Sequence, residues 1–137
     1  MTASISLPRP LVNELLQHAQ GSENFEVCGL ISGHENHALR CYRIDNIAAD
    51  RQHRYQMDPA QQIAAMKTMR EHDETLFAIY HSHPGSPAVP SRTDISEAGY
   101  PEALYLIISL STKGVLEMRG FYMSDDDVTE VELEIGD

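Results

Sequence analysis

The sequence has few basic residues and no long apolar run, and each shortage excludes a class of protein. Lysine and arginine number 10 against 21 acidic residues, so the formal net charge is −11. A chain this acidic repels a phosphate backbone, which argues against nucleic acid as a partner. No apolar stretch approaches the roughly 18 residues that a membrane span requires, so we expect no transmembrane helix and no membrane partner.

An export signal and a disulfide framework are also missing. The first ten residues, MTASISLPRP, contain no basic segment followed by an apolar run, which a secretory signal would have. We therefore expect a cytoplasmic protein, in a compartment that keeps thiols reduced. The two cysteines, Cys28 and Cys41, are predicted to be free and to fill space near the core.

The length and composition fit one globular domain. The chain has 137 residues, and a domain takes roughly 100–200. Apolar residues make up 42% and charged residues 23%, which are ordinary values for a folded domain. We expect a single domain over residues 1–137.

Helical and strand patterns alternate along the chain. Helices are predicted over 8–20, over 59–72 and from Arg92 onward. The second of these follows an Asp58 cap and contains an apolar stripe of Ile63, Met66 and Met69. Strands are predicted over 25–32, 38–47, 76–81, 103–110, 115–123 and 128–135, with turns at 113–114 and 125–127. This order predicts an α/β domain with a mixed sheet and about three helices.

The segment from His81 to Asp94 has the features of a metal site. His81 and His83, two residues apart in an extended strand, project from the same side and can bind one divalent metal. Three prolines stiffen the 84–90 loop, so that it can return Asp94 to a defined place as a third ligand. Three protein ligands leave one position of a tetrahedral zinc open to water, which is typical of catalytic zinc sites.

Hydrolysis at such a site needs a proton acceptor that later donates to the leaving group, and one carboxylate can do both. Glu26 is the best candidate, because it lies in the otherwise apolar segment FEVCGLI. Asp45 and Asp58, in contrast, occupy turn and cap positions that already explain them.

Each part of this pattern also has an ordinary structural interpretation. A histidine pair occurs without metal, a lone glutamate is often an edge-strand residue, and Ser91 with Asp94 three residues on resembles a helix capping box. These interpretations do not explain the histidine pair, the stiff loop and the isolated glutamate together. Tyr55 is interpreted as part of a helix entry, and the remaining histidines as surface residues: His18, His34, His37, His53 and His72.

Taken together, Glu26, His81-Ser82-His83-Pro84 and Ser91-x-x-Asp94 resemble the JAMM (MPN-plus) metalloprotease motif. The segment Glu26-Val27-Cys28-Gly29-Leu30 resembles the compact prokaryotic branch, and the resemblance extends over about residues 5–123. It implies a cytidine-deaminase-like (MPN/JAB) fold with one zinc held by His81, His83 and Asp94. It also implies that Glu26 is the general base and acid, and that Ser91 stabilises the oxyanion.

The resemblance also suggests a substrate. Compact members look like peptidases that process small ubiquitin-like sulfur-carrier proteins after a C-terminal Gly-Gly, so the carrier tail is the expected partner. Such a tail could dock as an added strand at a sheet edge. The alternatives are a zinc peptidase or amidohydrolase for another small peptide or isopeptide, and a non-catalytic MPN scaffold. A nucleobase deaminase is disfavoured, because its His-x-Glu and Pro-Cys-x-x-Cys motifs do not appear.

Overall fold

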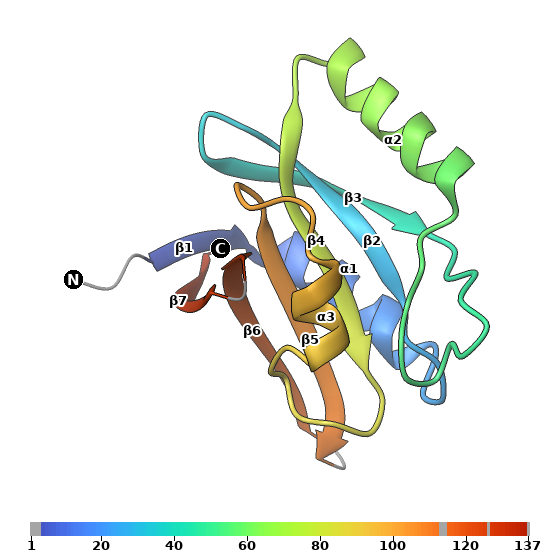
Figure 1. Cartoon of the computed structure of the whole chain (residues 1–137). Coiled ribbons are helices and arrows are strands. Elements are labelled where there is room, and N and C mark those ends of the chain that lie inside the picture. The colour runs from blue at the N-terminus through green and yellow to red at the C-terminus, as the bar shows by residue number, and fades with distance from the viewer. Residues whose placement is uncertain (1–3, 113–114, 126, 137) are drawn as a thin grey trace.

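The computed structural model describes residues 4–112, 115–125 and 127–136. Seven strands in these ranges form one sheet (Figure 1). The strand order is β1-β7-β6-β5-β4-β2-β3. The central pair β4/β5 and the edge pair β1/β7 are parallel, and the other neighbours are antiparallel, so the predicted mixed sheet is confirmed. The strands are β1 (Ser4–Pro8), β2 (Cys28–His34), β3 (His37–Ile44), β4 (Thr75–His83), β5 (Leu104–Thr112), β6 (Val115–Ser124) and β7 (Asp127–Gly136).

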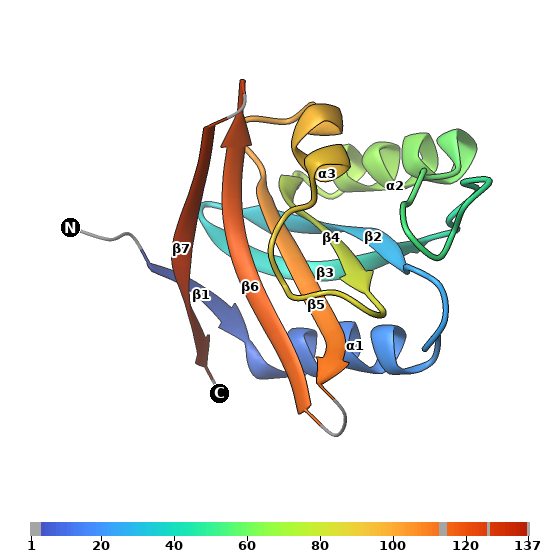
Figure 2. The same ribbon diagram turned by 60° about the horizontal axis from the view of Figure 1, so that its bottom comes forward.

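Helices cover both faces of the sheet. Helix α1 (Arg9–Gln20) packs on one face, whereas α2 (Pro59–Glu71) and α3 (Arg92–Glu97) lie on the other (Figure 2). One apolar core forms between α1 and the sheet, and a second core forms beneath α2. Because β4 and β5 are parallel neighbours, the chain must cross over between them, and α3 lies in this crossover.

The second helix begins as predicted but faces the sheet differently. The Asp58 carboxylate accepts a hydrogen bond from the N–H of Ala60, which confirms the cap. The predicted stripe is partly wrong, since Met69 is buried but Ile63 is 67% exposed. Ala65 and Met69, four residues apart, share the face that contacts the sheet, and Ile63 lies on another side of the helix.

Strand β1 is absent from the sequence-based prediction. It has five residues, and its parallel partner β7 lies at the opposite end of the sequence, so no local pattern reveals the pairing. The curled sheet also brings β1 close to β3. The predicted turn at 113–114 and Asp126 of the second predicted turn lie outside the described residues. No helix in the described ranges is long and apolar enough to cross a bilayer.

Candidate active site

The structure brings the three predicted ligands together. His81 and His83 occupy alternate positions of β4, which extends two residues further than predicted, and Asp94 lies in the first turn of α3. All three side chains are buried. Oδ2 of Asp94 lies 3.2 Å from Nε2 of His81 and 3.0 Å from Nε2 of His83, and the two Nε2 atoms are 3.1 Å apart. One ligand atom from each residue could therefore reach a common ion.

The hydrogen bonds around this cluster favour a cation. Nδ1 of His83 lies 2.8 Å from the carbonyl oxygen of Pro87, which can only accept, so Nδ1 carries a proton, and a neutral His83 ring would have its Nε2 lone pair free for a cation. Asp94 Oδ2 is itself an acceptor and already takes the N–H of Ser91 at 2.9 Å. A bound divalent cation would satisfy these converging acceptor atoms, so the residues fit a metal site.

The capping box at α3 is present and includes the predicted ligand Asp94. Ser91 Oγ accepts the N–H of Asp94 at 3.0 Å, while the Ser91 N–H donates to the Asp94 carboxylate. The structural interpretation of Ser91 is therefore confirmed. The preceding loop is tied to β5 by a 2.7 Å hydrogen bond from Ser109 Oγ to the Ser86 carbonyl oxygen. These contacts hold the Asp94 carboxylate in place.

Glu26 lies just before β2, not within it as predicted, because the strand begins at Cys28. Its N–H donates to the carbonyl oxygen of Arg51 at 2.8 Å, and its own carbonyl oxygen accepts Nδ2 of Asn46 at 3.0 Å. The next residue, Val27, is bound to Ser82, between the two histidines, through both its N–H and its carbonyl oxygen. Long-range contacts therefore hold Glu26 next to the ligand strand.

The Glu26 side chain has the properties of a proton carrier. It is only 5% exposed, and Oε1 has no hydrogen-bond partner among the described residues. Burial raises the pKa of Glu26 to about 8, against the opposing influence of His83. A buried carboxyl group without a partner is costly, and such groups are typical of functional sites.

Two residues near the site differ from the sequence-based interpretation. The ring of Tyr55 stacks on His81 with centroids 4.5 Å apart and an interplanar angle of 27°, so Tyr55 contacts a predicted ligand. His18 is only partly a surface residue, since it is half-buried, its Nδ1 lies 2.7 Å from the Tyr80 hydroxyl group, and burial lowers the pKa of His18 to about 4. Neither residue belongs to a motif, and only the packing of distant segments reveals these contacts.

The family model described as "Prokaryotic homologs of the JAB domain" matches residues 8–121. The chain belongs to the prokaryotic JAB family. It is 34% identical over 121 residues to the CysO-cysteine peptidase of Mycobacterium tuberculosis, covering 88% of this chain and 83% of that protein. It is 32% identical over 116 residues to the desampylase of Haloferax volcanii, covering 80% of this chain and 84% of that protein.

Solved structures agree with this assignment. A protein from Desulfitobacterium hafniense matches with a TM-score of 0.84 and 33% identity, over 96% of this chain and 92% of that one. A JAB1/MPN domain protein from Archaeoglobus fulgidus matches in fold, with a TM-score of 0.61 and 18% identity, over 98% of this chain and 99% of that one. The predicted family and its JAB/MPN fold are thus confirmed.

Proposed function

We propose that the chain is a zinc peptidase that hydrolyses the bond after the C-terminal Gly-Gly of a small ubiquitin-like sulfur-carrier protein. The observation that carries the proposal is the buried Glu26 carboxyl group near the cluster of His81, His83 and Asp94, with an Oε1 atom that has no hydrogen-bond partner among the described residues. The names of relatives support the substrate class, since they include a CysO-cysteine peptidase, desampylases and a probable TtuB-protein conjugate cleaving protease. Residues 1–137 would form this one catalytic domain, and free Cys28 and Cys41 suit a reducing cytoplasm.

His81, His83 and Asp94 would hold one zinc per chain. When bound, zinc supplies a Lewis acid that activates water and polarises the scissile carbonyl group near neutral pH. Burial lowers the pKa of His81, which favours the neutral imidazole that a ligand must be. Tyr55, stacked on the His81 ring, would fix the plane of that ligand.

Glu26 would move the proton. It accepts a proton from the attacking water and then delivers it to the amine that leaves when the C–N bond breaks. Burial raises the pKa of Glu26, which suits delivery of a proton to the leaving amine. A bound cation beside it would favour the ionised carboxylate, which suits the accepting half of the task.

Ser91 would stabilise the negative charge on the carbonyl oxygen. Its Oγ accepts the Asp94 N–H, and this bond does not use the hydroxyl proton. The exposed hydroxyl group can therefore donate to the developing oxyanion while it still caps α3.

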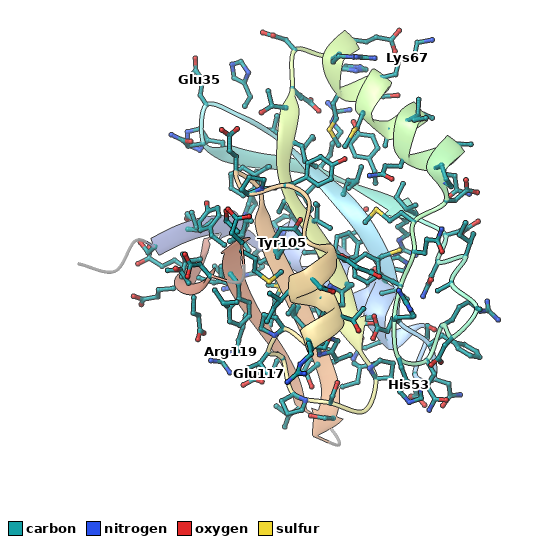
Figure 3. All side chains as sticks on the ribbon, viewed as in Figure 1. Glu35, His53, Lys67, Tyr105, Glu117 and Arg119 are labelled. Carbon is teal, nitrogen blue, oxygen red and sulfur yellow. The ribbon has the colours of Figure 1, made fainter. Side chains whose placement is uncertain are left out.

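A cavity of about 210 Å³ is linked to the cluster through Tyr55, which stacks on His81, and it could receive the carrier tail. Tyr55, Tyr100 and Tyr105 line it, together with Ile79 of β4. Figure 3 shows Tyr105 over the middle of the sheet, and its hydroxyl group accepts the N–H of Tyr100 at 3.1 Å. A tail of two glycines suits a passage walled by rings, since glycine has no side chain to accommodate.

Mass spectrometry of a carrier protein that ends in Gly-Gly plus one further residue tests the proposal. The zinc-loaded parent should produce the Gly-Gly form, and the matched Glu26→Gln variant should not. Chelation should stop cleavage and added zinc should restore it. A zinc-loaded parent that leaves the bond intact in carriers of this class would contradict the proposed function.

A further inference from the structure

A second cavity, of about 380 Å³, begins at Glu26 and shares none of its described lining residues with the tyrosine-lined cavity. Its walls come from the end of α1, the segment before β2 and the segment after β3. Phe25 and Ile47, which line it, are 44% and 49% exposed, so the cavity opens to solvent. It can therefore admit part of a substrate at the position of the proton carrier.

Arg51 supplies the positive charge of this cavity. Its guanidinium carbon lies 4.6 Å from the centroid of the Phe25 ring, and Arg51 forms no ion pair within the described part of the chain. His18 also lines the cavity, but burial lowers the pKa of His18 to about 4 and keeps it neutral at pH 7. The carboxylate of Asp45, another lining residue, already accepts a hydrogen bond from Gln61 at 2.8 Å.

The backbone couples this arginine to the proton carrier. The N–H of Glu26 donates to the carbonyl oxygen of Arg51, so the backbones of these two lining residues are adjacent. The group that protonates the leaving amine must contact its nitrogen. A leaving group that contacts Glu26 could extend into the cavity that Glu26 and Arg51 both line.

We propose that Arg51 binds the α-carboxylate of the leaving group, so that the chain prefers to release a carboxy-terminal amino acid over a lysine side chain. This inference rests on the proposed function. Water adds OH to the glycine carbonyl carbon and H to the departing nitrogen, and the leaving amino acid carries its carboxylate one carbon from that nitrogen. An isopeptide-linked lysine has no carboxylate at this distance. The planar guanidinium group matches a carboxylate with two parallel hydrogen bonds.

The test compares two carrier substrates that end in Gly-Gly-Ala, one with a free carboxylate and one with a carboxamide. The parent should cleave the free acid with a kcat/KM about 10-fold higher than that for the carboxamide, mainly through a lower KM for the acid. In Arg51→Gln the preference should disappear, and Arg51→Lys should recover part of it. Arg70→Gln is the matched control, because Arg70 is exposed in the last turn of α2 and outside the cavity, and it should retain the preference. Equal cleavage of both substrates by the parent, or an unchanged preference in Arg51→Gln, would overturn the assignment.

Binding separates this inference from the proposed function. Tail peptides ending in Gly-Gly-Ala, as acid and as amide, are titrated by NMR into Glu26→Gln and into the Glu26→Gln, Arg51→Gln double variant. Tighter binding of the acid only where Arg51 is present supports the inference, and equal affinities in both proteins refute it. If the zinc-loaded parent cleaves neither carrier substrate, the proposed function fails, and the binding comparison still decides the role of Arg51.

Discussion

Two buried carboxyl groups meet at this site, one at the start of α3 and one just before β2, and their surroundings differ. Asp94 accepts the Ser91 N–H and contacts both histidines. Burial alone would raise the pKa of Asp94, but its hydrogen bonds with His81 and His83 outweigh burial and hold the pKa well below its usual range. Glu26 has an unpartnered oxygen, and burial raises its pKa to about 8.

This difference supports the two different tasks proposed for these carboxyl groups. A carboxylate that stays ionised suits a metal ligand, because the ligand must keep its negative charge. A carboxyl group that titrates near neutral pH suits a proton carrier. The environment of each group, more than its chemical type, separates the roles of Asp94 and Glu26.

The largest effect should follow removal of the ligands. Asp94→Asn, and the double variant His81→Ala, His83→Ala, should lose zinc and with it all measurable turnover, because too few ligand atoms remain to hold the metal. Elemental analysis of the purified variants measures the zinc content. His53→Ala is the control, since this exposed histidine lies at the edge of the molecule (Figure 3) and should leave zinc in place. Unchanged zinc in the double histidine variant would disprove the ligand assignment.

The Glu26→Gln substitution should give the opposite combination of effects. It keeps the shape of the side chain but removes the proton acceptor, so the rate should fall by about 100-fold or more. The zinc content should remain that of the parent. If Glu26→Gln loses zinc, then Glu26 is a ligand and the contrast with Asp94 no longer holds.

Ser91→Ala should affect both the rate and the stability. Loss of the oxyanion donor should lower the rate by about 100-fold. Loss of the cap should reduce the free energy of unfolding by about 1 kcal/mol. Turnover and thermal unfolding must be measured on the same sample, with turnover expressed per folded molecule. A variant that melts earlier yet keeps the parent rate would restrict Ser91 to the capping role.

A smaller, pH-dependent effect is expected at His18. Burial favours the neutral form of both His18 and Glu26, so it lowers the pKa of the imidazole and raises the pKa of the carboxyl group. The neutral form is favoured in the folded protein, since the pKa of His18 falls from 6.5 to about 4. Protonation of the unfolded chain below about pH 6.5 therefore favours unfolding, and this loss of stability grows until about pH 4.

Replacing His18 by glutamine removes this titration. Between pH 7 and pH 5 the parent should lose about 1 to 2 kcal/mol more stability than His18→Gln, a range that allows for the partial exposure of the ring. Urea unfolding at both pH values measures the difference. Parallel loss of stability in the two proteins would show that His18 is not held neutral by burial.

The sequence-based prediction succeeded where the geometry is local. His81 and His83 share a face because alternate residues of a strand do, and a short proline-rich loop returns Asp94 to them. The prediction did not include the stacking of Tyr55 on His81, and it missed β1, which pairs with the distant β7. These contacts join segments far apart in the chain, and neither segment carries a pattern that specifies its partner.

The sequence alone therefore determined the family, the mixed α/β fold and the residue types of the candidate metal cluster, because motif spacing and local periodicity can be read directly from the chain. Only the tertiary structure decided the environment of Glu26. Its position depends on backbone contacts with Asn46 and Arg51 and on the hydrogen bonds of the next residue, Val27, with Ser82. Its raised pKa depends on burial among these segments. Burial is a property of packing in three dimensions, so the chemistry of this carboxyl group and its proximity to Arg51 emerge only when the chain is folded.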